Sequence, residues 1–245
     1  MAINIMRIAK ERKKKDKDLQ LDNLVKYPIL VINAKTYNES NIKKVVKIAK
    51  ICEVIEKKYM KDIIFCPQVT ELGLVCHASN VKVFSQHIDA VQPGAHTGFV
   101  LAESVKELGA IGTILNHSEH KLNFETLKKS ILRAKKAGLL SLVCASTPRE
   151  AMKIASLKPD MIAIEPPELI GGDVSVSTAK PEVITDTVAK VNKVANIPVL
   201  CGAGIKSKED VKIAISLGAK GVLVASGVIK SQNPRKSISE LVSGL

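Results

Sequence analysis

The 245-residue sequence predicts a single α/β domain built as a closed (β/α)8 barrel. Short apolar runs alternate with segments of helical length, which is typical of a parallel sheet covered by crossover helices. Eight such pairs follow one another, and eight strand–helix units close into a barrel rather than an open sheet. An open, doubly wound sheet is the alternative that the same pattern allows.

The expected strands are apolar throughout, as strands buried on both faces should be. They cover residues 29–33, 62–66, 81–85, 111–115, 140–144, 161–164, 198–201 and 221–224. Each is followed by a segment of helical period and length. The expected helices cover residues 40–59, 69–77, 102–108, 124–137, 148–156, 181–194, 208–217 and 234–242.

Several of these helices carry recognisable start and stop signals. Proline suits the first helical turn, serine caps an N-terminus that has acidic residues in its first turn, and glycine ends a helix. The starts are Pro148, Pro181 and Ser207, and the stops are Gly109, Gly138 and Gly218.

The composition predicts a soluble, cytoplasmic protein. Although 46% of the residues are apolar, no apolar run approaches the 20 residues that cross a bilayer. Residues 7–18 are rich in charge and lack the apolar stretch and cleavage site of a secretory signal. The cysteines form no CxxC pair, so we expect core or strand-end thiols rather than a metal site or disulfides. They are Cys52, Cys66, Cys76, Cys144 and Cys201.

The net charge of +13 favours anionic partners. Residues 1–26 hold eight basic and four acidic side chains, and we assign them to an N-terminal basic extension that precedes a barrel domain over residues 27–245. Aromatic residues make up only 3% of the chain and offer few platforms for stacking bases, so nucleic acid is not the expected partner. A small anionic substrate fits the composition better.

Residues directly after the strands are the place to look for chemistry, because barrel enzymes build their active sites at the carboxyl ends of the strands. Glu165 follows the apolar run 161–164, where burial would raise its pKa toward the range of a useful general base. A carboxylate that only caps a backbone amide is the structural alternative.

His117 and Lys35 follow two other strands. A short helix beginning near His117 would favour the neutral imidazole, which can donate a hydrogen bond to a developing oxyanion. The alternation Asn33-Ala34-Lys35 predicts that Asn33 and Lys35 face inward together at the first strand end, where the ammonium group can stabilise negative charge. A structural histidine and a solvated surface lysine are the plain alternatives.

Glycines mark the remaining loops at this end of the barrel. Gly202-Ala203-Gly204 and Ala225-Ser226-Gly227 follow the last two strands, where many barrels bind phosphate through backbone N–H groups. Residues 166–172 have stiff prolines at one end and flexible glycines at the other, which indicates a lid. Turn formation alone is the alternative for the glycine loops.

Taken together, these motifs resemble those of archaeal triosephosphate isomerases. The resemblance extends from about residue 27 to the C-terminus, in the family's order, and is highly specific. Its motifs are Ile32-Asn33-Ala34-Lys35-Thr36-Tyr37, Gln86-His87, Pro93-Gly94-Ala95-His96-Thr97-Gly98, Asn116-His117-Ser118-Glu119, residues 163–171, Cys201-Gly202-Ala203-Gly204-Ile205 and Val224-Ala225-Ser226-Gly227.

The resemblance implies a TIM barrel that interconverts D-glyceraldehyde 3-phosphate and dihydroxyacetone phosphate in glycolysis and gluconeogenesis. It implies no cofactor, no metal and a homotetramer, with a homodimer as the alternative. Glu165 would be the base and His117 the electrophile, with Glu119 supporting the catalytic group. The implied substrate-binding residues are Asn33, Lys35, Ile170, Gly171, Gly204, Ala225 and Ser226.

Three positions depart from the family's pattern. Gly171-Gly172-Asp173 replaces the usual Gly-Thr-Gly, which makes lid closure the doubtful step. Ala34 and His120 are unusual at their positions but remove no catalytic group.

Two rival functions fit parts of the sequence. One is an aldolase or biosynthetic isomerase with the same phosphate loops, and the other is a non-enzymatic scaffold whose basic tail binds RNA or a partner. A Schiff-base aldolase would need a buried strand-end lysine, and the fourth to seventh strands offer none.

Overall fold

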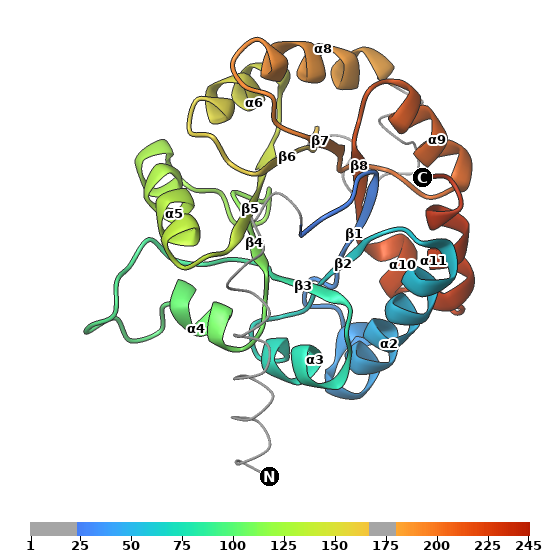
Figure 1. The fold of residues 1–245 in the computed structure, drawn as a ribbon, viewed down its shortest axis with the longest axis horizontal. Helices are drawn as coiled ribbons and strands as arrows, with labels where there is room; N and C mark the ends of the chain where they lie inside the picture. Colours follow the sequence, from blue (N-terminus) through green and yellow to red (C-terminus); the bar gives the residue numbers. More distant parts are fainter. Residues whose placement is uncertain (1–23, 167–179) are drawn as a thin grey trace.

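The computed structural model describes residues 24–166 and 180–245, which form the closed parallel barrel that the sequence predicts (Figure 1). Each strand pairs in parallel with its neighbours in the sequence, and β1 closes the barrel by pairing with β8. The strands are β1 (Ile29–Asn33), β2 (Ile63–Cys66), β3 (Lys82–Ser85), β4 (Gly112–Leu115), β5 (Leu140–Ala145), β6 (Met161–Ile164), β7 (Val199–Cys201) and β8 (Gly221–Val224).

Helices surround the strands as an outer ring (Figure 1). They are η2 (Asn38–Ser40), α2 (Ile42–Tyr59), α3 (Leu72–Ala78), α4 (Ala102–Glu107), α5 (Phe124–Lys136), α6 (Pro148–Ala155), α8 (Pro181–Asn192), α9 (Lys208–Ser216), α10 (Ser226–Ile229) and α11 (Pro234–Val242). Strand ends match the sequence prediction to within one residue, because the apolar runs are bounded by polar or turn-forming residues.

The predicted helix signals are present. Pro148 and Pro181 begin α6 and α8, where the missing N–H of proline costs no helical hydrogen bond. Ser207 and Asp210 form a capping box at the start of α9. The three expected stop glycines all have positive φ, a conformation that side chains with a Cβ rarely adopt: Gly109 (104°), Gly138 (70°) and Gly218 (98°).

Some helix boundaries differ from the prediction. The helix expected from residue 69 begins at Leu72, because Gln68 to Glu71 form a turn closed by the bond from Glu71 N to Gln68 O (3.1 Å). The one expected from residue 40 begins at Ile42, with Asn41 as its cap. The short helix α10 was not expected as a separate element.

The buried residues form two layers separated by the strands. Alternate strand residues fill the barrel interior, among them Val31, Ile64 and Phe84, while Leu30 and Ile32 pack outward against the helices. Gly112 faces Phe84, and a Cβ at Gly112 would lie 2.5 Å from the Phe84 ring. The absence of a side chain at Gly112 therefore makes room for the Phe84 ring in the barrel interior.

The structure also shows where the cysteines and the end of the proposed N-terminal extension lie. All five cysteines are free and buried, as expected for core and strand-end thiols. No described helix is long and apolar enough to span a bilayer. Leu24 and Val25, at the end of the proposed N-terminal extension, pack against the interior of the barrel.

Candidate active site

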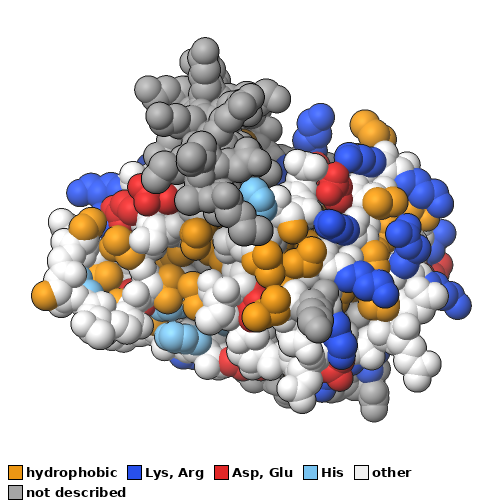
Figure 2. All heavy atoms as spheres, turned by 90° about the horizontal axis from the view of Figure 1, so that it is seen from below, with side chains coloured by type: hydrophobic (Ala, Val, Ile, Leu, Met, Phe, Trp, Pro, Cys, Tyr) orange, Lys and Arg blue, Asp and Glu red, His pale blue; other side chains and the backbone are white. Residues whose placement is uncertain are grey.

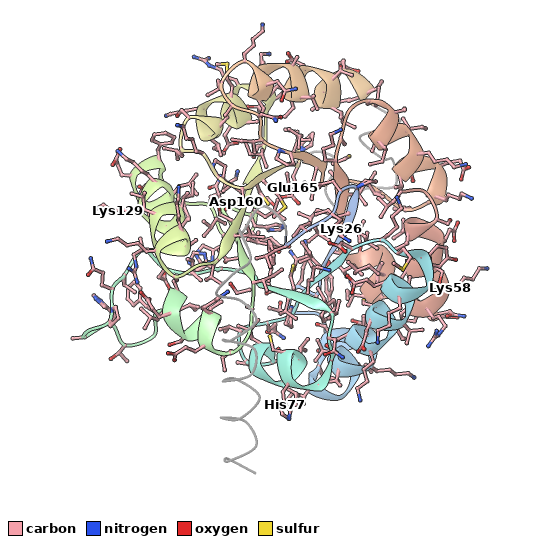
Figure 3. The ribbon with its side chains drawn as sticks, in the orientation of Figure 1. Lys26, Lys58, His77, Lys129, Asp160 and Glu165 are labelled. Atoms are coloured by element: carbon pink, nitrogen blue, oxygen red, sulfur yellow. The ribbon has the colours of Figure 1, made fainter. Side chains whose placement is uncertain are left out.

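Most of the predicted site residues lie at the carboxyl ends of the strands around one cavity of about 300 Å³, whereas Glu119 lines a neighbouring cavity. The cavity is lined by residues from β1, β4, β6, β7 and β8 and their following loops, including Asn33, Lys35, His117, Glu165, Gly204, Ala225 and Ser226. Figure 3 shows Glu165 within the ring of strands, whereas Lys58, His77 and Lys129 lie on the outer rim. Side chains from distant parts of the sequence therefore converge on one space.

Glu165 is held at the end of β6 by the bond from its N–H to Ala145 O (2.8 Å), and only 4% of the residue is exposed. Its Oε2 atom is buried and accepts no hydrogen bond from the described residues, so the structure does not favour the simple capping role. Burial raises the pKa of this carboxyl, although the nearby His117, Cys144, Lys35 and Lys121 oppose the shift. These properties are those of a general base.

Gly202 provides the space for this carboxylate. A Cβ at Gly202 would lie 2.5 Å from Glu165 Cγ and 3.2 Å from Cδ, both of which belong to a buried side chain. The glycine that the sequence placed in a phosphate loop thus also determines where the Glu165 side chain can lie.

His117 faces Glu165 across the cavity, with 3.6 Å between His117 Nε2 and Glu165 Oε1. The Glu119 N–H donates to His117 Nδ1 (3.2 Å), so Nδ1 is the acceptor of the imidazole. In the neutral ring the proton is therefore on Nε2, the nitrogen that faces Glu165. No helix begins here, contrary to the expectation. Residues 118–120 form a single turn, closed by the bond from His120 N to His117 O (2.8 Å), and α5 begins only at Phe124. The backbone bond to Nδ1, rather than a helix dipole, therefore orients the imidazole.

Lys35 lies beside the cavity in a strained conformation, with φ of 47°. Its N–H donates to Asn33 Oδ1 (2.9 Å), and its Nζ pairs with Glu119 Oε1 (2.7 Å). Only 12% of the Lys35 side chain is exposed, against 60% for Glu119. Because Glu119 contacts both Lys35 and His117, it can orient the two groups that face the cavity.

Gln86 is a member of this site that reasoning from single residues missed. Its Nε2 donates to Lys35 O (3.2 Å) and to Cys66 O (3.0 Å), and so ties the strained end of β1 to β2. The signals in the sequence are its position directly after β3 and the Gln86-His87 motif of the family resemblance, which gave Gln86 no role. His120, one of the unusual residues, stacks on His87 with 4.1 Å between ring centroids, at the edge of a neighbouring cavity.

The glycine loops after β7 and β8 line the same cavity. Gly204 has φ of 70°, and Ala225 and Ser226 lead into α10. Lys206 also lines this side and was not predicted. Ile170, Gly171 and the expected lid, including Asp173, lie outside the described residues. Within the described ranges, no group of three or more His, Cys, Asp or Glu side chains could hold a metal ion.

This chain is similar to known proteins over most of its length. Residues 28–243 match the family model described as triosephosphate isomerase. The triosephosphate isomerase of Methanothermus fervidus is 44% identical over 217 residues, covering 88% of this chain and 98% of that protein. That of Methanocaldococcus jannaschii is 44% identical over 87% of this chain and 98% of its own length, and that of Methanothermobacter thermautotrophicus is 42% identical over 92% and 98%.

Proposed function

Because this chain belongs to the triosephosphate isomerase family, we propose that Glu165, His117 and Lys35 carry out its reaction in the cavity at the strand ends. The chain is an enzyme that interconverts D-glyceraldehyde 3-phosphate and dihydroxyacetone phosphate, an aldose–ketose isomerisation of glycolysis and gluconeogenesis. Membership of this family also argues against the rival aldolase function. The observation that supports the site assignment is the convergence of these three side chains on one cavity.

The proposed mechanism moves one proton between neighbouring carbons and one proton between the two oxygens that they carry. The Glu165 carboxylate removes a proton from the carbon next to the carbonyl, which leaves an enediolate, and then returns a proton to the neighbouring carbon. His117 donates from Nε2 to the enediolate oxygens and transfers a proton from the hydroxyl oxygen to the former carbonyl oxygen, and the Lys35 ammonium group stabilises the negative charge. In this scheme Glu119 is a positioning residue, because its described contacts are with Lys35 and His117.

The substrate phosphate is proposed to lie against the loops after β7 and β8. Gly204, Ala225 and Ser226 line the cavity on the side away from His117's strand, and glycine permits close approach of backbone N–H groups to an anion. Asn33 and Lys35 would contact the substrate from β1. Ile170 and Gly171 remain proposed ligands from the lid.

Replacing Lys35 with methionine tests this assignment. The variant keeps most of the side-chain volume but loses the charge, so kcat/KM should fall about 100-fold, with both a lower kcat and a higher KM. Steady-state isomerase kinetics would measure both parameters. Lys129→Met, on the outer rim in Figure 3, is the matched control and should behave as wild type. Equal activity of the two variants would remove Lys35 from the site.

We also propose that the chain assembles with copies of itself, as a homotetramer rather than the alternative homodimer. Residues 92–99 are exposed throughout, including Phe99, and the loop projects from the ring beside α4 (Figure 1). Figure 2 shows hydrophobic side chains grouped on the face that includes α3 and α4, where Leu74 and Leu108 are exposed. Apolar patches of this kind mark interfaces. Sedimentation velocity should give a tetramer mass. A dimer mass at micromolar concentration would favour the alternative, and a monomer mass would contradict self-assembly.

A further inference from the structure

Strand β4 ends at a strained residue directly before His117. Asn116 has φ of 58° and is 2% exposed. A residue with a Cβ pays a conformational cost in this region, and such a conformation persists only where the surrounding contacts hold it. The contacts of Asn116 therefore decide how the chain enters the turn that carries His117.

The Asn116 carboxamide is fully used inside the protein. Its Nδ2 donates to Cys144 O (2.9 Å) and to Glu150 Oε1 (3.1 Å), and its Oδ1 accepts from Leu122 N (3.0 Å). The bond to Leu122 closes the loop that begins at His117. The two Nδ2 bonds fix that loop to β5 and to the first turn of α6.

Glu150 is the side-chain partner in this network. Its Oε1 accepts from Asn116 Nδ2 and from Lys121 Nζ (3.3 Å), and its Oε2 accepts from Ser146 N (2.7 Å). Burial opposes ionisation, but the Ser146 N–H, the Lys121 charge and the Asn116 amide outweigh it and lower the pKa of Glu150. Glu150 is therefore a fixed carboxylate that holds both ends of the His117 loop, at Asn116 and at Lys121.

We propose that Glu150 is a positioning residue for His117, acting through Asn116. The inference rests on the proposed function, because it assumes that His117 acts on the substrate. Glu150 does not line the cavity and touches no reacting atom. Its role is to keep the Asn116 conformation that directs Nε2 of His117 at the cavity.

A purely structural role for Glu150 is the competing explanation, and the chain offers a matched control for it. Thr147 caps α6 by accepting from Glu150 N at Oγ1 (3.1 Å). Thr147→Ala removes a capping bond from the same helical turn and leaves the Asn116–Glu150 side-chain contact in place. Loss of a cap lowers stability without moving His117.

Steady-state kinetics and thermal unfolding of Glu150→Ala, Glu150→Gln and Thr147→Ala test the proposal. Misplacing a catalytic group by about 1 Å can cost up to about 100-fold, so we expect Glu150→Ala to lower kcat about 10-fold with KM changed less than about twofold. Thr147→Ala should keep kcat within about twofold of wild type despite a lower melting temperature. In Glu150→Gln the amide oxygen can still accept from Asn116, so kcat should stay within about threefold of wild type. If Glu150→Ala lowers kcat no more than Thr147→Ala, the proposal is wrong.

Glu150→Ala in the His117→Gln background separates this inference from the proposed function. If Glu150 acts through His117, Glu150→Ala should lower kcat less than about twofold in the His117→Gln background. Two substitutions that act through the same group do not have additive effects on kcat. The same 10-fold cost on both backgrounds would show that Glu150 acts elsewhere. Full activity of His117→Gln alone would instead overturn the assignment of His117 as a catalytic residue. A large loss of activity in His117→Gln, with no effect of Glu150→Ala on wild type, would overturn only the positioning role of Glu150.

Discussion

Glu165→Gln should lower kcat by about 1,000-fold or more, in the upper half of the 100- to 10,000-fold range that general bases contribute. Glutamine has nearly the shape of glutamate but cannot accept the carbon-bound proton, and no other described carboxylate lines the cavity. Coupled isomerase assays on the folded variant measure the effect. Glu107→Gln, an exposed residue of α4, is the control and should retain wild-type activity. A Glu165→Gln variant with wild-type kcat would remove the base from the mechanism.

The raised pKa of Glu165 gives this prediction a pH dependence. The base must be ionised, so kcat/KM should fall with decreasing pH through a pKa above the ordinary value of 4.5 for a glutamate. The folded state binds this proton more tightly than the unfolded state, so the free energy of unfolding decreases as pH rises from the unfolded pKa through the folded one. Above that window the ionised carboxylate destabilises the fold. Glu165→Gln should therefore melt at a higher temperature than wild type at pH 8, and this gain should disappear below pH 4.5.

His117→Gln should lower kcat about 100- to 1,000-fold, the cost of removing one donor to a developing oxyanion. An amide can still donate a hydrogen bond, but it lacks the fixed orientation that the Glu119 N–H gives to the imidazole, and it cannot exchange a proton between the two substrate oxygens. KM should change little, because the loss concerns the transition state. His77→Gln, on the outer rim in Figure 3, is the control, and equal rates for the two variants would exclude His117.

The barrel and the positions of its main site residues could be predicted because both depend on local sequence. In a parallel barrel, every strand delivers the residues after it to the same end, so Glu165, one position past its apolar run, and His117 and Lys35, two positions past theirs, can be predicted from the sequence. The apolar runs set the strand limits equally well. Gly202 was also identified in this way, although its close approach to Glu165 was not.

The missed features depend on contacts between segments far apart in the chain. Gln86 acts on Lys35, 51 residues away, and Glu150 acts on Asn116, 34 residues away, so neither partner can be read from a local pattern. The expected helix at His117 was wrong because Asn116 and Leu122 close a compact loop there instead. Asparagine is enriched at positive φ among residues other than glycine, but this preference is too weak to locate the conformation of Asn116, and Lys35 carries no such signal.

Isomerisation of D-glyceraldehyde 3-phosphate in D2O, followed by NMR, tests the central claim most directly. A carboxylate base that removes a carbon-bound proton exchanges it with solvent, so wild type should place deuterium on carbon in both triose phosphates as equilibrium is approached. The Glu165→Gln variant at the same concentration should incorporate almost none over that time. Equal rates of interconversion and of deuterium incorporation by wild type and the variant would contradict proton transfer by Glu165.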